Sequence, residues 1–186
     1  MTDTEQSLLT LLRRALFGQD TPLPSDVDWQ RVFEEAVSHS VHLLVYDCLT
    51  EQERAALPEE TSAPWRQEVL SAMWYNEQLL GEQQEVLKAL SGLPCVILKG
   101  SSSAACYPRP ELRCAGDIDL LLFPADVKKA EAILCAMGYC PPEDNHPFHR
   151  SMHREQFLVE LHFEPPGIPS GDSGAPLPVS YTHLRA

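Results

Sequence analysis

The stretch that decides the fold is Gly116-Asp117-Ile118-Asp119-Leu120-Leu121, in which acidic and apolar residues alternate. Alternation with a period of two is typical of a β-strand, whose successive side chains point to opposite faces. Asp117 and Asp119 therefore share one face, with Cα atoms about 6.6 Å apart at a rise of about 3.3 Å per residue. Two carboxylates on one face can hold a divalent cation, and Mg²⁺ commonly uses one or two carboxylates together with substrate phosphates. An isolated Asp-x-Asp is more often a pair of exposed acids that binds nothing.

A further strand and a tight turn lie upstream of this stretch. The apolar run Cys95-Val96-Ile97-Leu98 predicts a short buried strand, and it ends at Lys99-Gly100-Ser101, where a short helix is expected to begin. Glycine lets a backbone approach a phosphate closely, and free N–H groups at the start of a helix attract an anion. Lys99 adds a positive charge. Serine after glycine is also an ordinary helix cap, which is the more frequent role of such a turn taken alone.

A third carboxylate lies further along the chain. Residues 157–163 alternate and predict another strand, in which Glu160 stands between Val159 and Leu161. Glu160 therefore points away from its two apolar neighbours, either into solvent or into a site. Arg113, in the loop before Asp117, can meet a phosphate, pair with an acid or remain an exposed loop residue.

The wider pattern predicts an α+β fold, with a helical N-terminal region and a small mixed sheet. Residues 1–92 carry apolar side chains at steps of three and four, which is typical of amphipathic helices. Pro58 and Pro64 predict a break before the clearest helix, over residues 65–90.

The predicted sheet belongs to a core over residues 93–163, which has three expected strands and a helix over residues 126–137. Residues 164–186 are rich in proline and glycine and are expected to form an irregular tail. The last seven residues, 180–186, resemble foreign read-through at the end of an incomplete gene fragment, so this end of the tail is expected to be non-native.

Composition limits the partners and compartments. The chain has 14 Lys and Arg against 27 Asp and Glu, and its net charge of −13 makes it a poor non-specific binder of nucleic acid. No apolar run approaches the roughly 18 residues that a membrane-spanning helix needs, and the first residues lack the basic start of a signal peptide. The 6 cysteines form no compact disulfide pattern. These features predict a soluble cytoplasmic protein with reduced thiols and no membrane partner.

Cysteines and histidines late in the chain allow a zinc interpretation, because sulfur and imidazole suit that ion. The set is Cys135, Cys140, His146, His149 and His153. Its spacing fits no compact zinc module, so structural zinc is the weaker interpretation. His162 shares a strand face with Glu160, either as a residue oriented by a site acid or as a structural histidine.

Together, these stretches resemble the nucleotidyltransferase superfamily that shares the polymerase-beta-type fold. Within it they are most similar to a bacterial family of uncharacterised nucleotidyltransferases. The resemblance rests on a Gly-Ser turn after a first strand, Asp-x-Asp on a second and an acid on a third. It covers about residues 28–163, and it is specific around residues 96–123 and weak before residue 60. The matching stretches are residues 96–100, 107–108, 112–113, 116–121, 138–139 and 159–163.

The resemblance implies a nucleotidyltransferase-like core and metal-dependent transfer of a nucleotidyl group. The donor would be a nucleoside triphosphate such as ATP, the acceptor is not identified by the sequence, and pyrophosphate would be released. The implied catalytic residues, which would also ligate Mg²⁺ or Mn²⁺, are Asp117, Asp119 and Glu160. The implied nucleotide-binding residues are Lys99, Gly100, Ser101 and Arg113.

The chain also departs from the family pattern. The interval between Gly100 and Asp117 is long for the superfamily, although this family tolerates the insert over residues 107–113. Family members also continue into further helices where this chain becomes irregular. The core is therefore expected to be truncated, and transfer by this chain to be inefficient.

Two alternatives remain open at this point. A nucleotide-sugar glycosyltransferase also uses Asp-x-Asp with a metal, but it needs a nucleotide-binding sheet upstream, where this chain is predicted to be helical. A non-catalytic, antitoxin-like binding protein on the same fold is the other.

Overall fold

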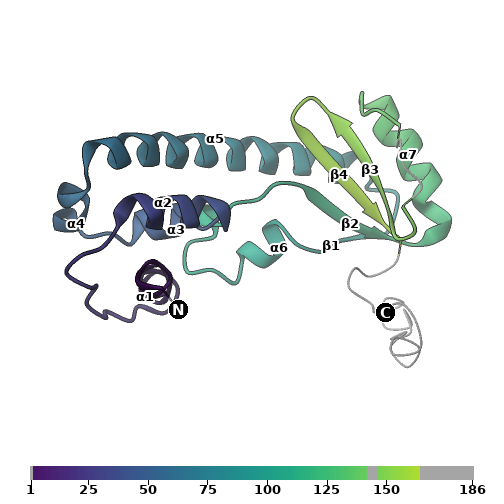
Figure 1. The fold of residues 1–186 in the computed structure, drawn as a ribbon. Helices are drawn as coiled ribbons and strands as arrows, with labels where there is room; N and C mark the ends of the chain where they lie inside the picture. Colours follow the sequence, from purple (N-terminus) through teal and green to yellow (C-terminus); the bar gives the residue numbers. More distant parts are fainter. Residues whose placement is uncertain (1, 142–145, 164–186) are drawn as a thin grey trace.

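The computed structural model describes residues 2–141 and 146–163, and it confirms the α+β fold (Figure 1). The chain begins with α1 (Asp3–Phe17), α2 (Trp29–Ser38), α3 (His42–Asp47), α4 (Glu51–Ala56) and α5 (Glu59–Ala89). It continues through β1 (Cys95–Ile97), α6 (Ser101–Ala104), β2 (Ile118–Leu122), α7 (Val127–Ala136), β3 (His149–Arg154) and β4 (Phe157–His162). Short 3-10 turns lie at Pro110–Leu112 and Pro124–Asp126. The tail expected over residues 164–186 lies outside the described residues.

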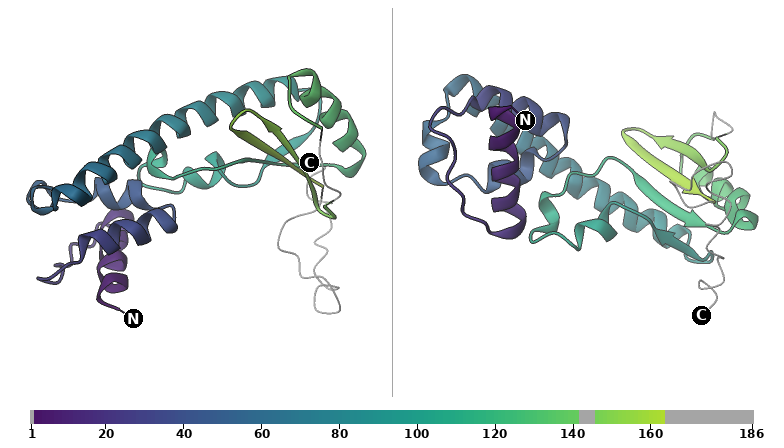
Figure 2. Two further views of the ribbon diagram at one scale, coloured as in Figure 1. Left: turned by 45° about the horizontal axis from the view of Figure 1, so that its top comes forward. Right: turned by 60° about the horizontal axis from the view of Figure 1, so that its bottom comes forward.

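Helix α5 connects the two halves of the molecule, because it runs from the N-terminal helices to the sheet (Figure 2). Near its start, Trp65 is fully buried in a hydrophobic core that it shares with α1, α2 and α3. Further along, Leu79 and Val86 pack into a second core beneath the sheet. One helix therefore belongs to both cores, and the predicted division of the chain at residue 92 stays a prediction.

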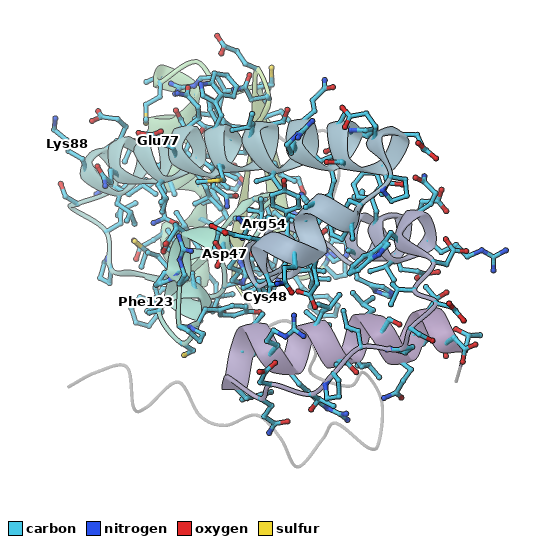
Figure 3. All side chains as sticks on the ribbon, turned by 90° about the vertical axis from the view of Figure 1, so that its left-hand side faces the viewer. Asp47, Cys48, Arg54, Glu77, Lys88 and Phe123 are labelled. Carbon is cyan, nitrogen blue, oxygen red and sulfur yellow. The ribbon has the colours of Figure 1, made fainter. Side chains whose placement is uncertain are left out.

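Polar contacts hold the short N-terminal helices together. Thr50 caps α4 by accepting a hydrogen bond from the backbone N–H of Glu53. The guanidinium of Arg14 on α1 donates to both carboxylate oxygens of Glu53, at 2.9 and 2.8 Å. Arg54 on α4 donates to the carbonyl oxygen of Asp47 at the end of α3, at 2.8 Å (Figure 3). These contacts link α1, α3 and α4.

The prediction that Pro64 breaks the chain before the long helix is wrong. Helix α5 begins at Glu59, directly after Pro58, and continues for 31 residues with Pro64 inside it. A proline ring tolerates helical φ angles, and its position near the start of the helix costs one hydrogen bond, to the carbonyl of Glu60. The burial of Trp65 and Val86 at the two ends of the helix outweighs that local cost.

Replacing Pro64 with alanine is therefore expected to stabilise the protein. Alanine restores a backbone N–H for the carbonyl of Glu60, and the exposed position requires no repacking. The unfolded chain gains some freedom, so the expected net gain is about 1 kcal/mol in the free energy of unfolding, measured by urea denaturation. Pro58→Ala, which restores no interior hydrogen bond, is the control. A less stable Pro64→Ala protein would contradict this account of α5.

The four strands of the described chain form one mixed sheet in the order β1-β2-β4-β3. β1 pairs antiparallel with β2, and β4 pairs antiparallel with β3. The central pair, β2 and β4, is parallel, and it places Asp119 opposite Glu160. Helix α7 makes the crossover from β2 toward β3 (Figure 1). The two strands that carry the acidic residues are therefore neighbours at the centre of the sheet.

One face of the sheet is covered by α5 and α7. Its central apolar side chains are at most 1% exposed, namely Ile118, Leu120, Val159 and Leu161. They pack with side chains of both helices, including Val86 and Leu134. Strand alternation places all four side chains on this face. The acidic side chains point to the opposite face, because neighbouring residues on a strand alternate.

Three strands were expected in the core, whereas the described part of the chain forms a sheet of four. Strand β3 has the sequence His-Arg-Ser-Met-His-Arg, in which Met152 is the one apolar residue. It forms an edge of the sheet, where polar side chains are tolerated on both faces. Hydrophobic periodicity therefore gave no signal for this strand, and its histidines were considered only as candidate zinc ligands.

Candidate active site

Three carboxylates converge on the face of the sheet opposite the apolar core. Asp119 lies within β2, Asp117 comes directly before that strand, and Glu160 lies opposite Asp119 on β4. One oxygen from each carboxylate lies within 4.8 Å of the others. The arrangement follows from the sequence pattern, since alternation sets the face and the parallel register sets the pairing.

Asp119 is the most constrained of the three acids. Its side chain is fully buried. Oδ1 accepts hydrogen bonds from Nζ of Lys99 at 3.2 Å and from Nε2 of His162 at 2.7 Å. Its other oxygen, Oδ2, is buried without a hydrogen-bond partner in the described part of the chain. The carboxylate is held in place by one cation and one imidazole.

The surroundings shift the pKa values of the two aspartates in opposite directions. Burial alone raises the pKa of Asp119, but hydrogen bonds from His162 and Lys99 outweigh it and hold that pKa below its usual value. Burial, together with the negative charge of Asp119, raises the pKa of Asp117 above its usual value. Asp119 is thus kept ionised, whereas the charge on Asp117 is costly unless a cation lies nearby.

The glycine turn after β1 lies beside these acids. Gly100 has a φ of 57° and a ψ of −119°, a backbone conformation that side chains disfavour. A Cβ at this position would lie 3.8 Å from the carbonyl oxygen of Asp117, so the need for glycine comes from φ rather than from space. Ser101 begins α6, which has 4 residues and is too short to contribute a substantial dipole. Its hydroxyl group exchanges hydrogen bonds with the side chain of Gln83, at 2.9 and 3.1 Å.

A pocket lies between the glycine turn and Asp117. Its lining includes three residues of the predicted nucleotide site, Gly100, Ser101 and Arg113, together with Asp117. Lys99, the fourth of the predicted nucleotide-binding residues, is absent from this lining and contacts Asp119. The sequence pattern had therefore selected positions that are neighbours in space, although Lys99 lies on the acidic side of the site.

Helix α5 supplies side chains to this pocket that received no role in the sequence analysis. Asn76 donates to the carbonyl oxygens of Glu111 and Arg113, at 3.2 and 3.0 Å, and accepts from the N–H of Ala115 at 3.2 Å. Its side chain thereby fixes the loop that carries Arg113. The one available signal was a polar residue inside an apolar helical pattern, and that signal does not reveal the partner.

The cysteine and histidine set considered for zinc does not come together. Among the described residues, two groups have the spacing of a metal site, and neither contains a cysteine or His153. One group is the three carboxylates, and the other is His149, Glu160 and His162. All 6 cysteines are free thiols.

The fold and the site define a class of protein. A mixed sheet with Asp-x-Asp on one central strand, an acid opposite it and a Gly-Ser turn beside both is the arrangement expected of a nucleotidyltransferase core. The family described as uncharacterised nucleotidyltransferase matches residues 25–167, and the chain belongs to this family. No curated protein and no solved structure matches the chain. No helix in the described ranges is both long and apolar enough to cross a membrane.

Proposed function

We propose that this chain binds a nucleoside triphosphate with a divalent cation and transfers its nucleotidyl group to an acceptor hydroxyl, releasing pyrophosphate. The observation that carries the proposal is the convergence of Asp117, Asp119 and Glu160 within 4.8 Å, on a face that adjoins the Gly100 turn. Membership of the nucleotidyltransferase family supports the same reaction class.

The three carboxylates fit Mg²⁺ or Mn²⁺. Both ions prefer hard oxygen donors, and the unpartnered Oδ2 of buried Asp119 is an oxygen atom that a cation would satisfy. A cation also offsets the burial and the repulsion from Asp119 that raise the pKa of Asp117. When bound, the ion neutralises charge on the phosphates and polarises the phosphorus under attack.

The remaining residues would position the triphosphate. Gly100 allows the backbone to approach a phosphate closely, while Ser101 and Arg113 line the same pocket and can donate to phosphate oxygens. Lys99 pairs with Asp119, and its side chain is 49% exposed, so its ammonium group can contact both the acid and an incoming phosphate. Such a site works mainly by positioning and charge neutralisation.

Binding is expected to require Mg²⁺ or Mn²⁺ and to discriminate little among the four bases, because these residues address the cation and the phosphates that every nucleotide shares. Lys99→Ala is expected to weaken binding about tenfold for each nucleotide, the effect of losing one charge-assisted contact. Ser101→Ala is expected to act in the same direction and also evenly across the bases. Isothermal titration calorimetry with ATP, GTP, CTP and UTP, with and without metal, measures both effects.

Lys128→Ala is the matched control, since it removes an exposed lysine of α7, on the side of the sheet away from the acids. Strong selection of one base, or binding that ignores the metal, would contradict the proposed site. The glycosyltransferase alternative finds no support in the structure, because the described residues before Cys95 contain no strand.

A further inference from the structure

A second group of metal-binding side chains lies beside the three carboxylates, on the hairpin formed by β3 and β4. His149 on β3 is the direct cross-strand partner of His162 on β4, and Glu160 lies two positions before His162. Directly paired residues and residues two apart on a strand share a face of the sheet, so all three side chains point to the same side. Backbone hydrogen bonds therefore fix their arrangement.

The distances within this group suit a common ion. Nε2 of His162 lies 3.1 Å from Oε2 of Glu160, and Nε2 of His149 lies 3.7 Å from Oε1 of the same carboxylate. Two ligands of a tetrahedral zinc ion are about 3.3 Å apart when each bond is about 2.0–2.1 Å long. One ligand atom of each residue lies within 4.8 Å of the others, so small side-chain rotations bring all three around one point.

The donor set differs in chemical kind from the carboxylate site. Imidazole nitrogen is a poor ligand for Mg²⁺ but a preferred one for Zn²⁺, Co²⁺ and related ions. Two histidines and one glutamate leave a coordination position open, as in zinc sites that bind water or substrate. His162 is 3% exposed, whereas the side chains of His149 and Glu160 are each 18% exposed, which provides a route of entry.

The ring of His149 is further held by a neighbour. His146 stacks on it with ring centroids 3.8 Å apart. The hydrogen bond to Asp119 keeps the ring proton of His162 on Nε2 while no ion is bound. The other ring nitrogen, Nδ1, has no hydrogen-bond partner in the described part of the chain, so the proton can move there when Nε2 binds an ion. Nε2 can therefore present its lone pair to an ion in exchange for its hydrogen bond to Asp119.

We propose that His149, Glu160 and His162 form a binding site for a divalent transition-metal ion of the zinc class, distinct from the carboxylate site and joined to it through Glu160. The existence of this ion site does not depend on nucleotide transfer. Its effect on nucleotide binding does rest on the proposed function, because an ion held by His149 and His162 would also use Glu160, the carboxylate that completes the proposed Mg²⁺ site.

A Co²⁺ titration of the full chain, free of any affinity tag and in excess Mg²⁺, tests the site directly. Cobalt in a four- or five-coordinate histidine–carboxylate site gives visible absorption bands that are much stronger than those of six-coordinate, oxygen-bound cobalt. We expect such bands at about one equivalent, and we expect Zn²⁺ to abolish them by displacement. His149→Ala is expected to weaken Co²⁺ binding by at least tenfold, since loss of even an outer contact to a metal ligand costs about tenfold.

Two control variants separate this site from the carboxylate site. His153→Ala removes an exposed histidine of the same strand and should leave the cobalt bands unchanged. Asp117→Asn should also retain them while losing Mg²⁺-dependent nucleotide binding, and Glu160→Gln should lose both. If His149→Ala fails to fold, as judged by circular dichroism, Glu160→Gln and the wild-type titration still decide the question.

Weak, six-coordinate cobalt spectra in the wild-type chain would overturn the proposal, as would strong bands that survive both His149→Ala and Glu160→Gln. The outcome for nucleotide binding is read separately by calorimetry. Cobalt bands without any nucleotide binding would contradict the proposed function and leave the second metal site standing. Nucleotide binding without the cobalt bands would contradict the second metal site and leave the proposed function standing.

Discussion

Asp119→Asn and Asp117→Asn are each expected to reduce Mg²⁺-dependent nucleotide affinity by about 100-fold, which corresponds to about 2.7 kcal/mol. Each substitution replaces a charged oxygen donor with a neutral amide at a site where three carboxylates converge within 4.8 Å. Calorimetry with ATP and Mg²⁺ gives the affinity. Equal binding by the wild type and Asp119→Asn would remove the basis of the metal assignment.

The two variants should differ in stability. Asp119 is fully buried against His162 and Lys99, and a neutral amide there weakens both contacts, so Asp119→Asn is expected to lower the free energy of unfolding. The pKa of Asp117 is raised by burial and by the charge of Asp119, and Asp117→Asn should therefore relieve repulsion and leave stability unchanged or higher. Asp26→Asn, at an exposed residue, controls for the general loss of one negative charge.

Leu120→Asp is expected to prevent folding. Leu120 is fully buried at the centre of β2, beneath α5 and α7, and a carboxylate there would have no partner. The combined loss of apolar contacts and burial of a charge exceeds about 4 kcal/mol, a large fraction of the stability of a chain of this size. Circular dichroism and urea denaturation report the loss.

Val96→Asp is the matched control for this variant. Val96 lies on the neighbouring strand β1 but is 45% exposed, so the same new charge remains in contact with water. A folded Leu120→Asp protein with the stability of Val96→Asp would show that the reverse face of the sheet is not the core.

Much of the fold could be predicted because its elements show their period in the sequence. The stretch over residues 116–121 alternates strictly, and both its strand and the face of its acids follow from that. Helix α5 was recognisable over residues 65–90, but its first turns were lost because Pro64 is an unfavourable helix residue whose cost is met by packing elsewhere. Strand β3 has no apolar period, so its side chains do not reveal it in the sequence. It is a strand because its backbone pairs with that of β4.

The candidate site was predictable to the extent that it depends on strand geometry. Alternation and strand pairing bring Asp117, Asp119 and Glu160 together, so their proximity could be anticipated. Asp119 is buried in contact with Lys99 and His162, which lie 20 and 43 positions away in the chain. A local sequence pattern does not reveal contacts between residues so far apart. The position of His149 depends on strand β3, which carries no apolar period in the sequence.

The parallel pairing of β2 with β4 also bears on how the protein is synthesised. While the ribosome is still producing the segment after β2, Asp117 and Asp119 lie next to each other without the strand that carries Glu160 and His162. The hydrogen bonds within each N-terminal helix join residues four positions apart and can form as the helix emerges, whereas the parallel pair must close a loop of about 40 residues. The group of three carboxylates is thus completed late in folding, and a nascent chain halted before residue 157 would possess the helices and only two of the three acids.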